Sequence, residues 1–271
     1  MRRPFFFLLI VLLLLPCVLA QAAELRVDFY DVGKADAMLI TTPDGTRVLI
    51  DTATNKEGKA LVKRFEEEGI DTIDLMLITH FDKDHVGGAD KILEDIRVAQ
   101  VIVPTYDKES NQYEQFVEAL QKSLQTQVTR MGAAERIDLQ LGDVQMYITA
   151  AHETDYGEDE ENDFSLAVRL TYGDTRFFFT GDAEAPRQSE LLKEGDVACD
   201  VLKVPYHGRL VSVSERFLTA AGPSIAFITD SDEEPANPLV VALLERLGAQ
   251  VYCAKDGGIT VVSDGKTVSV K

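Results

Sequence analysis

The feature that most constrains the fold is a polar segment directly after a continuous apolar run. Residues 75–79 read Leu-Met-Leu-Ile-Thr, which predicts a short strand that is buried on both faces. His80, Asp82, Asp84 and His85 follow, so two imidazoles and two carboxylates stand within six positions. A loop that leaves a buried strand can direct several side chains to one point. Because imidazole and carboxylate bind divalent transition metals, the segment predicts a metal site.

A solvated acidic loop is the alternative explanation for this segment. The chain has 46 Asp and Glu residues among 271, so neighbouring aspartates arise easily by chance. Histidine is different, because the chain has only four, and chance would seldom place two of them in this window. The histidines therefore favour metal binding over a solvated loop.

Two later segments also place a polar group directly after an apolar strand. Asp182 follows a predicted strand at residues 175–180, and His207 follows another at residues 199–204. Taken alone, Asp182 is typical of a helix cap or a turn, and His207 is typical of a structural histidine. Both stand at the carboxyl ends of predicted strands, where the sites of α/β folds collect. This shared position favours a common site.

The rest of the chain alternates strand-like and helix-like stretches without a clear internal repeat. Strands are predicted at residues 25–32, 37–41, 47–51, 75–79, 98–103, 144–150, 164–171, 175–180, 199–204, 225–229, 250–253 and 258–262. Helices are predicted at residues 58–68, 88–96, 109–127, 186–193, 214–221 and 237–247. Mixed strands and helices without a linker indicate one layered α/β domain over residues 24–271.

Several short segments also follow one another in an order typical of a known family. They are Phe29-Tyr30-Asp31-Val32-Gly33-Lys34-Ala35-Asp36-Ala37, Leu49-Ile50-Asp51, residues 80–85, Asn162-Asp163-Phe164-Ser165-Leu166, Phe179-Thr180-Gly181-Asp182 and Val204-Pro205-Tyr206-His207-Gly208. In that order they resemble the DVGQGDA, LIDxG, HxDxDH, NNxSL, FTGD and VPHHGS segments of the metallo-β-lactamase superfamily, within it the soluble hydrolase domain of ComEC-type competence proteins. The resemblance implies an αββα sandwich of two mixed β-sheets flanked by helices.

The resemblance also implies a metal-ligand set from three parts of the chain, namely His80, Asp82, Asp84, His85, Asp182 and His207. The first two residues would face one metal position, and the next two would face a second position. Asp182 would bridge the two positions, and His207 would complete the second. The implied cofactor is one or two divalent ions. Because half of the ligands are carboxylates, Mn or Fe is as compatible with the set as Zn.

Two departures from the family pattern bear on this site. Many members supply a further histidine on a middle strand, and His152 is the only candidate here, although it stands outside the matching segment. The first metal position is therefore expected to be weak or empty. Tyr206 and Arg209 replace the His and Ser of the VPHHGS segment. This makes Tyr206 a candidate proton donor or substrate contact.

The implied activity is hydrolysis by a metal-bound hydroxide, since a bound ion lowers the pKa of water from 15.7 to about 7. Asp84 is the candidate residue that orients or deprotonates this nucleophile. A phosphodiester, such as nucleic acid, is the expected substrate. Two alternatives stay open: hydrolysis of another small ester, amide or lactone, and a non-catalytic module with a degraded metal site.

The charge of the chain limits its partners. Its formal net charge is −19, and the sequence contains no cluster of Lys and Arg of the kind that follows a phosphate backbone. So acidic a protein repels polyanions at long range. We therefore expect no tight, non-specific binding of nucleic acid. A small molecule or a short, transiently bound phosphodiester stays compatible with this charge.

The first twenty residues are typical of a cleaved signal peptide. Arg2 and Arg3 precede an apolar run at residues 5–15, and Ala20 ends a small-residue cleavage pattern. A retained membrane anchor is the alternative, but the run is shorter than the ~20 residues of a membrane span. We therefore expect a secreted or extracytoplasmic protein without a stable span. Such an address permits a disulfide between Cys199 and Cys253, and two free thiols are equally compatible with the sequence.

We expect the exported protein to begin near Gln21. Cleavage there removes two arginines, so the net charge moves from −19 to about −21. Intact-mass spectrometry of the exported protein checks this expectation. A mass that still includes residues 1–20 would show that the segment is retained.

Overall fold

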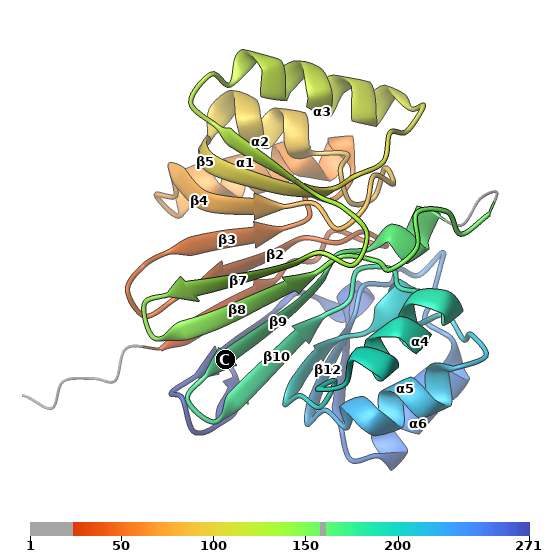
Figure 1. Ribbon diagram of the computed structural model, residues 1–271. Helices are drawn as coiled ribbons and strands as arrows, with labels where there is room; N and C mark the ends of the chain where they lie inside the picture. Colours follow the sequence, from red (N-terminus) through yellow and green to blue (C-terminus); the bar gives the residue numbers. More distant parts are fainter. Residues whose placement is uncertain (1–23, 158–160) are drawn as a thin grey trace, which may run out of the picture.

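The protein is a four-layer sandwich in which two β-sheets pack face to face between two layers of helices (Figure 1). The structure is a computed structural model that describes residues 24–157 and 161–271. The αββα architecture expected from the sequence is confirmed. The predicted signal peptide lies outside the described residues. Within the described ranges, no helix is both long and apolar enough to cross a membrane.

The first sheet has eight strands in the order β15-β14-β1-β2-β3-β4-β5-β6. Its strands from β3 to β6 are parallel, and the remaining neighbours are antiparallel. The strands are β1 (Leu25–Phe29), β2 (Met38–Thr41), β3 (Arg47–Ile50), β4 (Thr72–Leu77), β5 (Arg97–Pro104), β6 (Gln127–Met131), β14 (Ile259–Ser263) and β15 (Val268–Val270).

The second sheet has seven strands in the order β13-β12-β11-β10-β9-β8-β7. Here the strands from β10 to β13 are parallel, and β7, β8, β9 and β10 form an antiparallel meander. The strands are β7 (Arg136–Leu141), β8 (Val144–Thr149), β9 (Ala167–Tyr172), β10 (Thr175–Phe179), β11 (Val201–Lys203), β12 (Ile225–Ile228) and β13 (Gln250–Cys253).

Helices cover the outer face of each sheet (Figure 1). The first sheet carries α1 (Asn55–Glu67), α2 (Ala89–Asp95) and α3 (Asn111–Lys122), and the second carries α4 (Ala185–Glu194), α5 (Ser214–Ala221) and α6 (Pro238–Arg246). Three short 3-10 helices are η1 (Glu161–Phe164), η2 (Pro205–Gly208) and η3 (Ala254–Asp256). The side chains of Thr54 and Ser110 accept backbone N–H groups at the starts of α1 and α3, which explains where these helices begin.

Three apolar layers fill the spaces between the four structural layers. Strand β4 contributes to two of them. Leu75 and Leu77 pack between the sheets, whereas Ile73 and Met76 pack under the helices. The prediction that this strand is buried on both faces is therefore confirmed. Its end consequently delivers the next residues into the interior of the molecule.

Three edge strands were missed by the sequence pattern. The helix predicted at residues 109–127 ends as α3 at Lys122, and Gln127 already begins β6. Strands β7 and β15 were not predicted at all. All three strands lie at sheet edges, and their side chains are mostly exposed or half-buried. Backbone pairing with one neighbour holds them in the sheet, so they lack the buried apolar alternation that identifies a strand from sequence.

Helices α1 and α2 approach each other through glycine. A Cβ atom on Gly58 would lie 2.4 Å from the Cα atom of Gly88, far inside van der Waals contact. A Cβ atom on Gly88 would lie 2.3 Å from the backbone oxygen of Thr52. This close approach holds the loop after β4 against α1, and it requires glycine at positions 58 and 88.

We expect Gly58→Ala to destabilise the protein by about 1–3 kcal/mol, as overpacking does in other cores. Helix propensity alone predicts the opposite sign, because alanine in a helix is favoured over glycine by about 1 kcal/mol. Urea denaturation measures the difference. Gly132→Ala is the matched control, since its Cβ atom would first meet a flexible side chain at 3.5 Å. Equal stability of the two variants would contradict the steric explanation.

Candidate metal centre

The polar residues singled out in the sequence come together where loops from both sheets meet. The loop after β4, a strand of the first sheet, carries His80, Asp84 and His85. Asp182 follows β10, and His207 lies in η2 after β11; both of these strands belong to the second sheet. The site therefore forms only when the two sheets are stacked.

His85 is held in place through one of its two ring nitrogens. Its Nδ1 atom lies 2.8 Å from Oδ2 of Asp51. The same carboxylate accepts the backbone N–H of Thr79 at 2.7 Å and the Thr79 hydroxyl at 2.7 Å. All three side chains are buried. The hydrogen bonds orient the imidazole and leave its Nε2 atom facing the other sheet.

The other two histidines are held in the same way. Nδ1 of His207 lies 2.8 Å from the backbone oxygen of Thr229, and Nδ1 of His80 lies 3.1 Å from the Thr79 hydroxyl. The Nε2 atoms of His80, His85 and His207 are buried and have no hydrogen-bond partner in the described part of the chain. An orphaned imidazole nitrogen whose ring is fixed through its other nitrogen fits a metal ligand.

Asp182 lies between two of these histidines. Its Oδ2 atom is 2.7 Å from Nε2 of His207 and 3.4 Å from Nε2 of His85. Ligand atoms of Asp36, His85, Asp182 and His207 all lie within 4.8 Å of one another, and all four residues are buried. Two imidazoles and two carboxylates at this separation make a candidate site for a divalent cation.

Asp36 was not in the ligand set expected from the sequence. It lies in the loop between β1 and β2, more than forty positions before His80. Both neighbours, Ala35 and Ala37, are buried, so a single carboxylate stands between two small buried residues. In the sequence, the signal for Asp36 is a single carboxylate between two alanines, inside the segment that resembles DVGQGDA. Its contact partners come from distant parts of the chain.

Lys203 supplies a buried positive charge beside the four ligand residues. Its Nζ atom lies 2.5 Å from Oδ2 of Asp36 and 3.2 Å from Oδ1 of Asp182, and it donates to the backbone oxygen of Gly181 at 2.9 Å. Burial opposes the charge, but Asp36 and Asp182 outweigh it and raise the pKa of Lys203. A buried charge is tolerated only when it is paired, and this lysine balances part of the negative charge of the site.

Asp82 and Asp84 flank the four-residue group. Oδ2 of Asp82 lies 3.8 Å from Nε2 of His80, whose ring centroid is 4.0 Å from that of His85. On the other side, Oδ2 of Asp84 lies 3.5 Å from Nε2 of His207. The structure therefore brings all six residues expected from the sequence into one contiguous cluster, with Asp36 as a seventh member.

The surroundings shift the pKa values of two histidines of the cluster in opposite directions. Burial and the neighbouring His85 lower the pKa of His80 to about 4, so His80 is neutral and can act as a ligand. Burial alone would also lower the pKa of His85, but Asp182, Asp36 and Asp51 hold it well above its ordinary value. A proton on His85 therefore balances carboxylate charge, and a bound cation would replace it.

The backbone is strained where His207 enters the cluster. Tyr206 has φ 52° and ψ 44°, and His207 has φ 50° and ψ 30°, so two consecutive non-glycine residues are left-handed. Each such residue costs about 1–2 kcal/mol. The strain turns the imidazole into the site. The Tyr206 hydroxyl accepts an N–H from Arg209 at 3.4 Å, and the Arg209 guanidinium lies over the Tyr206 ring.

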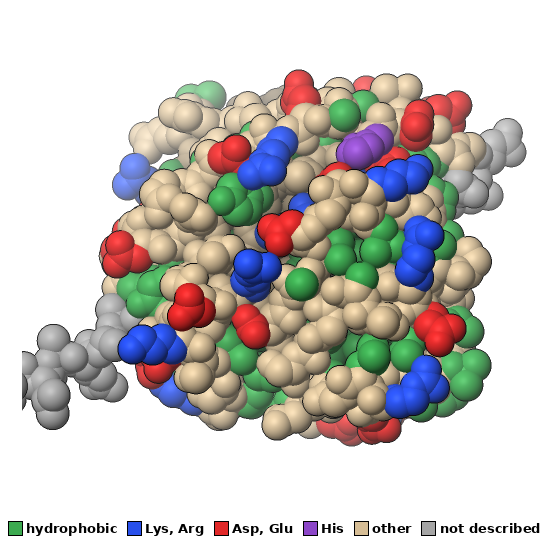
Figure 2. Space-filling view, turned by 60° about the horizontal axis from the view of Figure 1, so that its bottom comes forward, with side chains coloured by type: hydrophobic (Ala, Val, Ile, Leu, Met, Phe, Trp, Pro, Cys, Tyr) green, Lys and Arg blue, Asp and Glu red, His purple; other side chains and the backbone are tan. Residues whose placement is uncertain are grey.

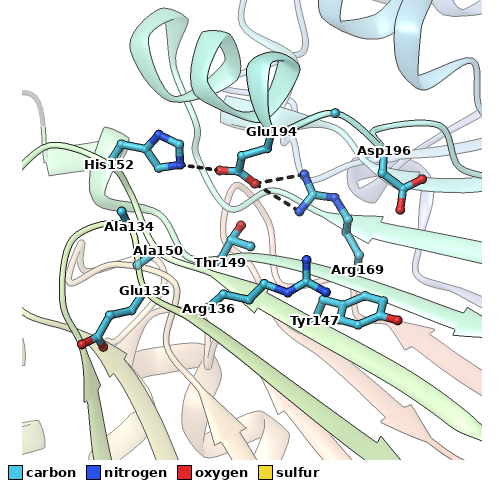
Figure 3. A pocket seen from close by; sticks show the side chains of 11 residues that line it. Ala134, Glu135, Arg136, Tyr147, Thr149, Ala150, His152, Arg169, Glu194 and Asp196 are labelled. Carbon is cyan, nitrogen blue, oxygen red and sulfur yellow. Dashed lines mark hydrogen bonds and ion pairs between the residues drawn. The ribbon is translucent and has the colours of Figure 1, made fainter.

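His152, the other histidine considered as a ligand, lies elsewhere. Its Nε2 atom pairs with Oε1 of Glu194 at 3.1 Å, in a cavity of about 360 Å³ (Figure 3). Arg169 contacts the same carboxylate from the opposite wall (Figure 3). The lining residues of this cavity include none of the seven cluster residues.

Beside His80 lies the Ser165 hydroxyl, 3.5 Å from Nδ1 of that histidine.

Comparison with known proteins identifies the family. The chain is 26% identical over 270 residues to ComE operon protein 3 of Bacillus subtilis (strain 168), covering 92% of this chain and 34% of the relative. It is 26% identical over 227 residues to Recombination protein 2 of Haemophilus influenzae, covering 82% of this chain and 26% of the relative. The chain thus spans about a third or less of these curated relatives, and the ComEC-type resemblance is confirmed.

Among solved structures, a metallo hydrolase of the archaeon Ignicoccus hospitalis matches with a TM-score of 0.57 and 16% identity. The match covers 88% of this chain and 98% of that protein, and it supports the fold. The family model described as "Metallo-beta-lactamase superfamily" matches residues 30–228, most of the described chain. The chain therefore belongs to the metallo-β-lactamase superfamily.

Proposed function

We propose that this protein is an exported, metal-dependent hydrolase of a phosphodiester. The observation that carries the metal-dependent part is the convergence of His85 and His207 on Asp182, with the His80 ring packed on that of His85. The Nε2 atoms of all three histidines lack hydrogen-bond partners among the described residues. Superfamily membership supports hydrolysis. One curated relative is named a recombination protein, and recombination is a reaction of nucleic acid, whose backbone is a phosphodiester. Export is proposed from the N-terminal pattern alone.

The cluster residues divide the work of holding the cofactor. His80 and Asp82 would hold an ion on one side, and Asp84, His85 and His207 would hold an ion on the other, with Asp182 between them. Divalent ions of Zn, Mn or Fe all suit this mixture of nitrogen and oxygen donors. When bound, such an ion supplies Lewis-acid activation of water and of the scissile phosphate.

Asp84 is proposed to orient the attacking water. Burial opposes its charge, but the neighbouring imidazoles of His207 and His85 hold its pKa far below the usual range. So weak a base is better suited to accept a hydrogen bond from water than to remove its proton. Tyr206 is proposed as the proton donor to the leaving group or as a substrate contact, since its hydroxyl accepts from Arg209 and keeps its own hydrogen free.

The surface charge favours a short or transiently bound substrate. On the face seen in Figure 2, Lys and Arg side chains are scattered among Asp and Glu and form no continuous basic patch. The chain has a net charge of −19, so it repels a long polyanion. A small ester, amide or lactone is the second candidate, because a metal site does not by itself select a leaving group.

We expect Asp84→Ala and His207→Ala each to lower kcat/KM for a generic phosphodiester by at least about 100-fold, the upper range for disturbing groups around a metal. Bound metal per chain should fall as well, as measured by elemental analysis. His152→Ala is the matched control and should leave both quantities unchanged, since it lies in a different cavity. Equal loss of metal in all three variants would add His152 to the ligands and contradict this assignment.

We also expect metal to stabilise the fold. Chelation should abolish hydrolysis and lower Tm, and Zn²⁺ or Mn²⁺ should restore both. An ion at 100 times its Kd adds about 2.7 kcal/mol to the free energy of unfolding. Scanning calorimetry measures Tm, and assays with a panel of charged and neutral esters measure hydrolysis. Full activity after complete metal removal would refute the proposed mechanism, and the absence of any turnover with metal would favour a non-catalytic module.

A further inference from the structure

Two lysines stand at the two ends of the cluster. Nζ of Lys34 donates to Oδ2 of Asp84 at 2.8 Å. Nζ of Lys108 donates to Asp82 and to Glu161. Both side chains are about one-fifth exposed, so each lysine contacts the cluster and is also partly open to solvent.

The two lysines are connected by an unbroken row of contacts. From the Lys108 end, Asp82 lies beside His80, whose ring packs on that of His85. The rings of His85 and His207 have centroids 5.6 Å apart, and His207 lies beside Asp84 at the Lys34 end. A substrate centred on this row therefore has one lysine on each side.

The position of Lys34 is determined by its loop. Gly33 has φ +69°, a left-handed conformation that turns the chain directly before Lys34. Two positions later, the backbone N–H of Asp36 donates to the oxygen of Asp84 at 3.0 Å. The loop that carries Lys34 is thus tied to the loop that carries Asp84. The family segment DVGQGDA has glutamine at this position, so the charge is a feature of this chain.

Lys108 borders an open space beside the cluster. A cavity of about 350 Å³ is lined by Asp82, Lys108, Glu161 and Asn162. The Oδ1 atom of Asn162 is buried there and has no hydrogen-bond partner among the described residues. Its Nδ2 atom donates to Glu184 at 2.8 Å, which fixes the amide. The space next to Lys108 is therefore large enough to admit part of a substrate.

The negative charge of the chain makes local positive charge necessary for binding an anionic substrate. The chain has a net charge of −19, so an anionic substrate is repelled at long range and needs local positive charge at the site. Each ammonium has three N–H donors and at present shares them with a carboxylate of the cluster. When a cation neutralises these carboxylates, the attraction that holds each lysine to them weakens, and its donors become available to a second anion.

We propose that Lys34 and Lys108 bind the non-bridging oxygens of the substrate phosphate from opposite ends of the cluster, and that they select phosphate esters over neutral esters. This proposal rests on the proposed function and assigns its substrate selectivity to two residues. Neither lysine is a metal ligand, because an ammonium has no lone pair to donate. Both are substrate-binding residues.

The test compares Lys34→Gln and Lys108→Met with Lys63→Met. Lys63 is the matched control, because it also pairs with a carboxylate, Glu67 at 3.7 Å, but on the exposed surface of α1. With metal-loaded protein, each cluster variant should raise KM for bis(p-nitrophenyl) phosphate about tenfold, the effect of losing one hydrogen bond to a charged group. The ratio of kcat/KM for the phosphodiester to kcat/KM for p-nitrophenyl acetate should therefore fall about tenfold, with each rate taken per bound metal ion. Lys34→Arg should preserve phosphodiester KM.

Direct binding of inorganic phosphate separates this proposal from the proposed function. Calorimetry of the metal-loaded protein should give about tenfold weaker phosphate binding in Lys34→Gln and Lys108→Met than in the wild type and Lys63→Met. If the wild type cleaves only neutral esters but phosphate binding still requires both lysines, the phosphodiester function and the selectivity for phosphate esters fail, and the assignment of phosphate binding to the two lysines stands. Unchanged phosphate affinity, or equal losses on charged and neutral esters, would overturn the lysine assignment.

Discussion

The site depends on one buried carboxylate, that of Asp51. It accepts two hydrogen bonds from Thr79, and its Oδ2 atom lies 2.8 Å from Nδ1 of His85. These interactions join the end of β3 to the end of β4. Asp51 itself has φ 56°, an uncommon conformation for a residue with a side chain. A buried polar network that is fully satisfied is rigid, and this one fixes the imidazole that lies at the centre of the cluster.

The second constraint is the balance of charge between the sheets. Asp36 comes from the first sheet and Asp182 from the second, and Lys203 lies between them with contacts to both. Removing one partner of such a buried group leaves a charge without compensation, which is strongly destabilising. The same arrangement therefore serves stability and function. It joins the two sheets, and it places Asp182 beside the Nε2 atoms of His85 and His207.

The two partly exposed lysines at the ends of the cluster are the groups proposed to bind the substrate. Lys34 and Lys108 supply positive charge at its ends, in a chain that is otherwise strongly acidic. On the face shown in Figure 2, basic side chains are scattered among acidic ones and form no continuous track for a long polyanion. A local pair of cations can bind one phosphate group without attracting a polymer, so the charge distribution and the proposed small or transient substrate agree with each other.

The sequence by itself determined the class of the fold and most members of the cluster. The apolar run of β4 was long enough to require burial on both faces, and histidines are rare enough in this chain for His80 and His85 to stand out. Asp182 and His207 were found because each directly follows a strand. These signals are local, since they depend on neighbours in the chain and on the periodicity of buried side chains.

Only the tertiary structure decided the rest. Asp36 and Lys203 meet across the two sheets, and no spacing in the sequence records that contact. His152 differs from the other histidines only in where β8 delivers it, beside Glu194 and away from the cluster. The edge strands β6 and β7 are held by backbone hydrogen bonds, which carry no side-chain pattern. A sequence reports which groups must be buried, whereas the stacking of the sheets decides which of them meet, because that choice depends on distances between residues far apart in the chain.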